Sequence, residues 1–127
     1  MARFLILDDD EDLGSVVEMI LQLDGHETAV LKRSQDAVAE QRARPADVLI
    51  TDIFMPDQDG LETIQQFRRE FPQVKIIAMS GGGDTLRNVS YLFSAREMGA
   101  VQVLRKPFEK EALLNVVQQV LGGPART

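Results

Sequence analysis

The chain has 127 residues, a length that suits one domain with one hydrophobic core. Hydrophobic residues make up 44% of the sequence, which is enough apolar surface to exclude a disordered chain. The lack of cysteine excludes disulfides and thiolate metal sites, and a formal net charge of −6 without a basic cluster disfavours nucleic-acid binding. No apolar run approaches the roughly 20 residues that span a bilayer, and no signal-peptide pattern opens the chain. We therefore expect a cytoplasmic protein whose partner is another protein or a cation.

Apolar residues follow two alternating patterns along the chain. Five short apolar runs predict buried strands, and after each run the apolar residues recur at the spacing of one helix face. The predicted strands cover 3–7, 26–31, 47–52, 74–79 and 101–104. The helices that follow them, in the same order, cover 13–21, 34–43, 61–67, 86–93 and 113–121. Ser34 is predicted to cap the second helix, and Asp84 is predicted to cap the fourth. Gly99 is expected to end the fourth helix, and residues 55–60 are expected to form a loop. This alternation predicts a parallel sheet with helices on both faces.

Polar residues follow four of the five predicted strands. They are Asp8 and Asp9 after the first strand, Asp52 at the end of the third, Ser80 after the fourth and Lys106 after the fifth. Because the carboxyl ends of parallel strands share one edge of the sheet, we expect these side chains to lie close together. Each residue alone has an ordinary role, as a helix cap, a turn residue or a solvated charge. Three carboxylates with a lysine and a hydroxyl, however, suit Mg²⁺ and a transferring phosphoryl group.

Four sequence blocks resemble the characteristic blocks of response-regulator receiver domains, the family of the chemotaxis response regulator. They are FLILDDDEDL, VLITDIFMPDQDG, IIAMS and GAVQVLRKPF, and the resemblance covers residues 3 to about 121. It implies a flavodoxin-like α/β fold, a doubly wound five-stranded parallel sheet of order 2-1-3-4-5 with five helices in a three-layer sandwich. We expect a stand-alone receiver domain over 1–122 and a flexible tail over 123–127.

The resemblance implies a phosphoacceptor and a magnesium site. By position, Asp52 matches the aspartate that accepts phosphate, and Asp8 and Asp9 match the acidic pair of the family. Asp9 and Asp52 would ligate Mg²⁺ directly, helped by the backbone carbonyl of Phe54. Asp8 would act on the metal through water.

Further residues match positions that bind the phosphoryl group in the family. Lys106 matches the lysine that pairs with the phosphoryl oxygens, and the Lys106–Pro107 bond is expected to be cis. Ser80 matches the residue whose hydroxyl turns toward the phosphate. The backbone N–H of Gly81 is a further expected donor to the phosphoryl group, and the backbone of Phe54 is expected beside it.

The function implied is that of a phosphoaspartate-accepting response regulator in a two-component phosphorelay. A sensor histidine kinase or a histidine phosphotransfer protein would supply the phosphoryl group in a Mg²⁺-dependent step. The domain would catalyse its own phosphorylation and dephosphorylation without being a conventional enzyme. The surface of the fourth helix, fifth strand and fifth helix would then change its binding to an unknown downstream protein, with no direct contact to nucleic acid or membrane.

Two features depart from the usual receiver pattern. Val103 stands where the family usually has an aromatic residue that acts as a rotamer switch. Tyr91 or Phe93 could take over that role, although ordinary packing explains both more simply. The segment between Ser80 and Lys106 is a few residues longer than usual, which predicts a longer loop or helix start at the output face.

Two other function classes stay open on the sequence alone. LDDDED also resembles the nucleophile motif of haloacid-dehalogenase-type phosphatases, although 127 residues leave little space for the rest of such an enzyme. A flavodoxin-like flavin or nucleotide binder would share the fold. The acidic cluster would repel an anionic cofactor of this kind unless a metal ion intervened.

Overall fold

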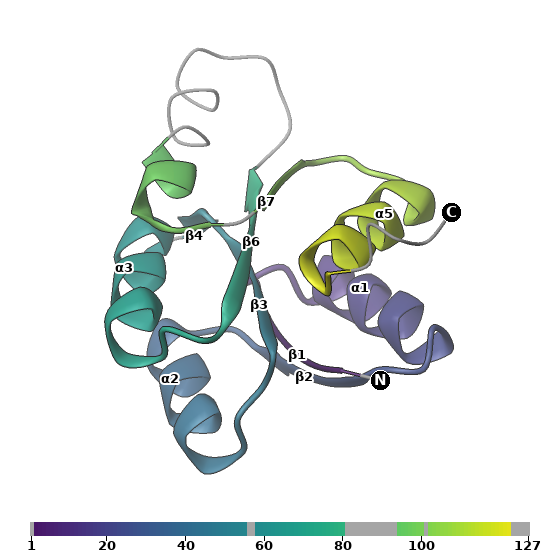
Figure 1. Ribbon diagram of the computed structural model, residues 1–127. Helices are drawn as coiled ribbons and strands as arrows, with labels where there is room; N and C mark the ends of the chain where they lie inside the picture. The colour runs from purple at the N-terminus through teal and green to yellow at the C-terminus, as the bar shows by residue number, and fades with distance from the viewer. Residues whose placement is uncertain (1, 56–57, 81–93, 101, 123–127) are drawn as a thin grey trace.

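The computed structural model describes residues 2–55, 58–80, 94–100 and 102–122 and shows a five-stranded parallel sheet between two layers of helices (Figure 1). The strands are β1 (Arg3–Leu7), β2 (Glu27–Leu31), β3 (Val48–Asp52), β6 (Lys75–Ser80) and β7 (Gln102–Arg105). They lie in the order β2-β1-β3-β6-β7, and each neighbouring pair is parallel. Since β6 and β7 correspond to the fourth and fifth predicted strands, the expected order 2-1-3-4-5 is confirmed.

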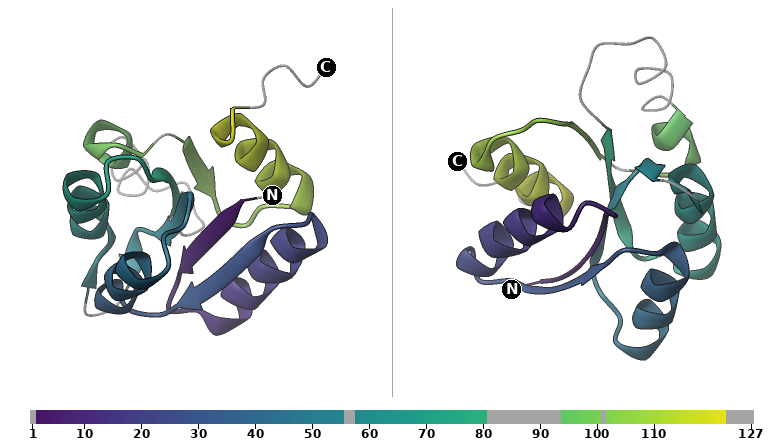
Figure 2. Two further views of the ribbon diagram at one scale, coloured as in Figure 1. Left: turned by 60° about the horizontal axis from the view of Figure 1, so that its bottom comes forward. Right: turned by 180° about the vertical axis from the view of Figure 1, so that it is seen from behind.

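Helices cover both faces of the sheet, as Figures 1 and 2 show. One face carries α1 (Glu11–Leu23) and α5 (Lys110–Val120). The other face carries α2 (Ser34–Ala43), α3 (Gly60–Glu70) and a helical segment over 94–98. Right-handed connections between parallel strands place successive helices in this way and leave the three-layer sandwich that the sequence predicts.

The two faces of the sheet carry separate hydrophobic cores. In β1, Phe4 and Ile6 pack with residues of α1 and α5, whereas Leu5 and Leu7 pack with residues of α2 and α3. All four side chains are fully buried. A strand that is buried on both faces has a continuous run of apolar residues in its sequence. Polar residues therefore appear in the sequence where a strand leaves the core. The carboxyl edge of the sheet is such a place.

Two local predictions were wrong. Ser34 is the first residue of α2 and not its cap; Arg33 holds the cap position without a capping side-chain hydrogen bond. The Ser34 hydroxyl lies 2.5 Å from the hydroxyl of Thr63 in α3, because α2 and α3 pack side by side. The stretch predicted as a loop after β3 contains a short antiparallel hairpin of β4 (Phe54–Met55) and β5 (Gln58–Asp59).

Most of the fourth predicted helix lies outside the described residues. Its Asp84 cap, the lengthened segment and the aromatic residues Tyr91 and Phe93 fall there, as does the tail over 123–127, so the domain boundary stays a prediction. The end of this helix is described: Gly99 follows it with a φ of +125°, a left-handed conformation that favours glycine. Within the described ranges, no helix has both the length and the apolar character needed to cross a bilayer.

Candidate functional site

Three carboxylates meet at the carboxyl edge of the sheet. Asp8 and Asp9 follow β1, and Asp52 ends the neighbouring strand β3. One carboxylate oxygen from each residue lies within 4.8 Å of the other two. Asp8 is fully buried and Asp52 is 4% exposed, whereas Asp9 is open to solvent. The pairing of β1 with β3 therefore brings Asp52 to the adjacent pair Asp8 and Asp9, from which it is far apart in the sequence.

The start of α1 holds the Asp8 carboxylate in place. The Oδ1 atom of Asp8 accepts a hydrogen bond from the backbone N–H of Asp10, at 2.9 Å. Asp10 is the N-cap of α1, and its side chain accepts from the N–H groups of Asp12 and Leu13. Aspartate commonly caps helices in this way. In the Asp-Asp-Asp run, Asp10 thus has the structural role, and Asp8 and Asp9 remain at the acidic site.

Lys106 brings a positive charge into the acidic site. Its Nζ atom lies 3.0 Å from Oδ2 of Asp8 and 3.3 Å from Oδ2 of Asp52. Burial lowers the pKa of Lys106, but the negative charges of Asp52 and Asp8 outweigh burial, so this pKa lies above its usual value. The ammonium group is therefore charged at neutral pH and links two buried carboxylates.

Backbone contacts place Lys106 beside the end of β6. The Lys106 N–H donates to the carbonyl of Ser80 at 2.9 Å, and Ser80 is 1% exposed. The Lys106–Pro107 peptide bond is cis, as the resemblance implies. Parallel pairing of β6 with β7 thus brings the serine and the lysine to the edge that carries the carboxylates.

Gly60 packs against the backbone that follows Asp52. A Cβ atom at position 60 would lie 2.5 Å from Cα of Ile53 and 2.6 Å from the carbonyl oxygens of Asp52 and Ile53. The Asp52 carbonyl also accepts a hydrogen bond from the Thr51 hydroxyl at 3.0 Å, and the Ile53 N–H donates to the Met79 carbonyl at 2.9 Å. The peptide after Asp52 is therefore fixed from several sides. Sequence reasoning missed this role of Gly60, because its one signal, an Asp-Gly pair, also reads as an ordinary turn.

The donor set suits a hard divalent cation. Asp8, Asp9 and Asp52 offer only oxygen ligands, which Mg²⁺ prefers, and Mg²⁺ commonly combines one or two carboxylates with water and phosphate. The three carboxylates exceed the single charge of Lys106, so the site attracts a cation. Asp9 is exposed, which gives an ion from solvent a first ligand to reach.

Comparison with known proteins decides the family. The family model named response regulator receiver domain matches residues 4–118. The chain belongs to the response regulator receiver domain family. It is accordingly a receiver domain of the two-component type, and neither the phosphatase nor the cofactor binder is favoured.

Curated relatives of this receiver are much longer proteins. The chain is 30% identical over 119 residues to the nitrogen assimilation regulatory protein NtrX of Azorhizobium caulinodans, covering 92% of this chain and 25% of that protein. It is 32% identical over 120 residues to the DNA-binding transcriptional regulator NtrC of Azospirillum brasilense, covering 94% of this chain and 24% of that protein. The receiver thus spans about a quarter of the length of these relatives.

Solved structures with the same fold include isolated receivers. The receiver domain of NtrX from Brucella abortus has a TM-score of 0.87 and 28% identity, covering 94% of this chain and 98% of that chain. The chemotaxis protein CheY4 of Vibrio cholerae has a TM-score of 0.85 and 27% identity, again covering 94% and 98%. The flavodoxin-like fold expected from the sequence is confirmed by these likenesses.

The other predicted site residues of the receiver differ in how much the structure describes. The backbone of Phe54 lies in β4, two residues after Asp52, while Gly81 falls outside the described ranges. Val103, half-buried in β7, packs against the core under α2 and α3. A valine has no ring to swing between two positions, so the usual aromatic switch is absent at this strand position.

An exposed apolar stripe on α1 was not foreseen from the sequence. Val16, Met19 and Leu23 are 45%, 54% and 82% exposed, and their spacing puts them on one helix face. The helix predicted over 13–21 has Val16 among the apolar residues of its one expected buried face, together with Val17 and Leu21, and only the latter two are buried. The apolar residues of α1 cover a wider part of the helix surface than the sheet buries. This width was the sequence signal that could have predicted an exposed apolar stripe.

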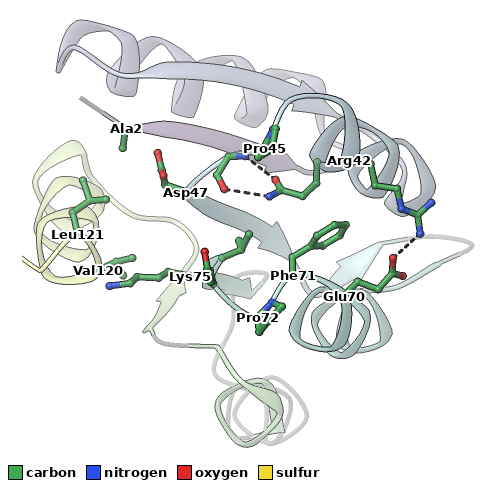
Figure 3. Close-up of a pocket in the computed structure, with 14 residues that line it drawn as sticks. Ala2, Arg42, Pro45, Asp47, Glu70, Phe71, Pro72, Lys75, Val120 and Leu121 are labelled. Atoms are coloured by element: carbon green, nitrogen blue, oxygen red, sulfur yellow. Dashed lines mark hydrogen bonds and ion pairs between the residues drawn. The ribbon is translucent and has the colours of Figure 1, made fainter.

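A cavity of about 940 Å³ lies at the opposite, amino-terminal edge of the sheet (Figure 3). Its walls come from the end of α2, the turn before β6 and the end of α5. At its rim Arg42 forms an ion pair with Glu70 at 2.6 Å, and the buried Gln41 amide bonds the backbone of Ala46. None of the three carboxylates of the acidic site lines this cavity, so the two sites lie apart in the structure.

Proposed function

We propose that this receiver accepts a phosphoryl group on Asp52 from a phosphohistidine of a sensor histidine kinase or a histidine phosphotransfer protein. The position of Asp52 carries the proposal: its carboxylate lies 3.3 Å from the Lys106 ammonium and belongs to the three-carboxylate cluster. Asp8 is fully buried and hydrogen-bonded through both oxygens, which makes it a poor nucleophile. Asp9 is exposed, and the ion pairs described for Lys106 are with Asp8 and Asp52.

In the proposed step, a carboxylate oxygen of Asp52 attacks the phosphorus of phosphohistidine. An O–P bond forms, the P–N bond breaks, and the donor imidazole leaves with the electron pair and takes up a proton. The Lys106 ammonium balances negative charge on the phosphoryl oxygens as the group moves. The Ser80 hydroxyl and the Gly81 N–H are the proposed donors to the remaining oxygens.

Mg²⁺ is the proposed cofactor of this step. Asp9, Asp52 and the backbone carbonyl of Phe54 would hold it, and it would supply positive charge close to the phosphoryl oxygens. Asp8 would act through water, a role supported by its two existing hydrogen bonds, to the Asp10 N–H and to Lys106. The same residues would admit water for hydrolysis of the acyl phosphate, so the receiver would catalyse both its phosphorylation and its dephosphorylation.

The exposed stripe of α1 is the proposed contact for the phosphodonor protein. The stripe lies on the helix that starts at Glu11, two residues after Asp9, so a protein bound there can present its phosphohistidine at the acidic site. The helix itself, EDLGSVVEMILQL, contains acidic but no basic residues. An apolar donor face flanked by basic residues would therefore fit this surface best.

Phosphorylation would shift the receiver between two states that differ in their contacts to the phosphoryl group. The bond from the Lys106 N–H to the Ser80 carbonyl joins the two proposed phosphoryl-binding residues through backbone. A movement of Ser80 would thus reach β7 and α5, whose surface is the proposed contact for a downstream protein. With Val103 in β7, repacking of that strand would replace the swing of an aromatic ring. A reducing, cytoplasmic setting fits the lack of cysteine.

An intact-mass measurement tests the proposal. The protein is incubated with Mg²⁺ and a small phosphodonor such as acetyl phosphate, which removes any need for the cognate kinase. The wild type should gain one phosphoryl group, whereas Asp52→Asn should gain none. No gain by the wild type at any Mg²⁺ concentration would refute the phosphoacceptor role.

A further inference from the structure

The outer side of β2 is an open edge of the sheet. In the described sheet β2 has one neighbouring strand, β1, and the register between the two is unbroken (Figure 1). The Glu27 N–H donates to the Ala2 carbonyl at 3.0 Å, so the backbone of Glu27 and of every second residue after it faces β1. The N–H and C=O groups of Thr28 and Val30 therefore point away from β1. Among the described residues, none bonds these four backbone groups.

The sequence of this edge does not block the addition of another strand. Proteins commonly protect an edge strand with proline, a bulge or a lysine within the strand. The strand ETAVL has none of these, and its pairing with β1 runs without a bulge. Ala29, Val30 and Leu31 are only partly buried, so apolar side chains reach the surface along this edge. Such an edge is suited to pair with a further strand.

The charges along β2 point to a second copy of the same strand. Asp24 and Glu27 lie at its start, Lys32 and Arg33 follow its end, and all four are exposed. Glu27 and Lys32 form ion pairs within their own chain, at 3.4 and 2.8 Å, but every side chain in these pairs is more than half exposed, and such pairs contribute little. Arg33 forms no ion pair with a residue that the structure describes. A strand with an acidic start and a basic end complements itself when two copies run antiparallel.

We propose that β2 pairs antiparallel with β2 of a second copy of this chain, about a twofold axis at Ala29. In this register Thr28 of each copy lies opposite Val30 of the other, and each such pair exchanges two N–H···O bonds. Glu27 of each copy lies diagonally across from Arg33 of the other, on the same face of the joined sheet. The two sheets thus become one continuous sheet. The pairing uses no residue of the acidic site, so it does not depend on the proposed phosphorylation.

Sedimentation at increasing protein concentration tests the association. An interface formed by one short strand is small, so the dimer should be weak and its population should rise with concentration. The average mass should increase from the 14.2 kDa of one chain toward twice that value. Asp52→Asn should associate as the wild type does, with or without Mg²⁺. A protein that stays monomeric at all concentrations would overturn the pairing.

Charge exchange tests the antiparallel direction. Glu27→Lys alone and Arg33→Glu alone each place like charges together at both ends of the pairing, and each should weaken the dimer on the order of tenfold. The double variant places opposite charges together again and should recover most of the wild-type affinity. Circular dichroism confirms that each variant is folded. A dimer that neither single variant weakens would be formed by another surface, which would refute the proposal.

A single engineered cysteine tests the register. The chain has no cysteine, so Ala29→Cys introduces one thiol per copy. On the twofold axis the two Cα atoms would lie about 4.5 Å apart as a non-hydrogen-bonded pair, a separation that a disulfide can span. Mild oxidation should therefore convert Ala29→Cys into a covalent dimer. The control Ala39→Cys, at an exposed position of α2, should cross-link at least on the order of tenfold more slowly. Equal cross-linking of the two variants would contradict the register.

Discussion

Replacing Gly60 by alanine should damage both the fold and the acidic site. The new Cβ would lie 2.5 Å from Cα of Ile53 and 2.6 Å from two carbonyl oxygens, whereas non-bonded carbon atoms prefer about 3.5–4.0 Å. These neighbours are backbone atoms of Asp52 and Ile53 and cannot rotate away. The peptide that carries the phosphoacceptor must therefore shift by roughly 1 Å.

The magnitude follows from this clash. Overpacking costs about 1–3 kcal/mol, and the upper part of that range, about 2–3 kcal/mol, applies because the new Cβ meets three backbone atoms. Alanine recovers about 1 kcal/mol through its better helix propensity at the start of α3. A net loss of about 1–2 kcal/mol is expected. For 127 residues, an unfolding entropy of about 2.1 cal/mol/K per residue converts this loss into a Tm lower by about 4–8 °C. Displacing the nucleophile by this distance should also slow phosphorylation by about ten- to a hundredfold.

Thermal unfolding followed by circular dichroism, with intact-mass time courses for phosphorylation, measures both effects. Gly14→Ala in α1 is the matched control, since its Cβ would meet only a side-chain methyl of Val30 at 3.1 Å. That variant should keep its Tm within about 2 °C of the wild type and its phosphorylation rate unchanged. A Gly60→Ala protein as stable and as reactive as the control would refute the packing argument.

Three further variants probe the core, the donor surface and the buried charge. Phe67→Ala removes a fully buried ring from the core under α3 and should lower the free energy of unfolding by about 3–5 kcal/mol in urea titrations; a loss below about 1 kcal/mol would contradict the core assignment. Met19→Asp, at a position 54% exposed, should leave stability and phosphorylation by a small donor unchanged but slow transfer from a phosphodonor protein. Equal transfer rates with the protein donor would exclude α1 as its docking surface. Because the pKa of Lys106 is raised in the folded protein, its stabilising effect is fully present below its ordinary pKa of about 10.4 and is lost as pH rises through the raised value. The stability difference between the wild type and Lys106→Met should thus be constant from pH 7 to about 10 and shrink above it in urea titrations; a difference that shrinks already below pH 9 would contradict the assigned pKa direction.

The position of the acidic site could be predicted because it depends on topology. If the apolar runs are strands of a parallel sheet, the strand ends place Asp8, Asp52 and Lys106 at one edge of the sheet. This placement does not depend on the conformation of their side chains. The receiver blocks then supplied the expected roles, and the cis bond before Pro107 and the strand order agree with them.

Features that depend on packing between distant segments could not be predicted. Ser34 carries the sequence signature of a cap, yet α3 supplies Thr63 as a better partner for its hydroxyl. The contact of Gly60 with the peptide after Asp52 needs the hairpin of β4 and β5 to return the chain to β3. The preference of Lys106 for Asp8 over Asp52 is a matter of a few tenths of an ångström, which spacing in the sequence does not encode.

The exposed stripe of α1 is a surface feature that the sequence alone did not predict. Apolar periodicity alone places Val16 beside Val17 on the buried face, but a helix that packs on a sheet covers only part of its circumference. The structure leaves Val16 45% exposed and thereby separates a packing face from a candidate docking face. That distinction requires the neighbours of α1, which only the folded structure provides.

Locating the phosphoryl group by chemical trapping tests the central claim most directly. The receiver is phosphorylated with Mg²⁺ and a small phosphodonor, reduced with borohydride to convert the acyl phosphate into an alcohol, and mapped by peptide mass spectrometry. The proposal predicts the reduced residue at position 52 alone, with no trapped product in the absence of Mg²⁺. A product at Asp8 or Asp9, or a phosphate ester at Ser80 with Asp52 unmodified, would contradict it.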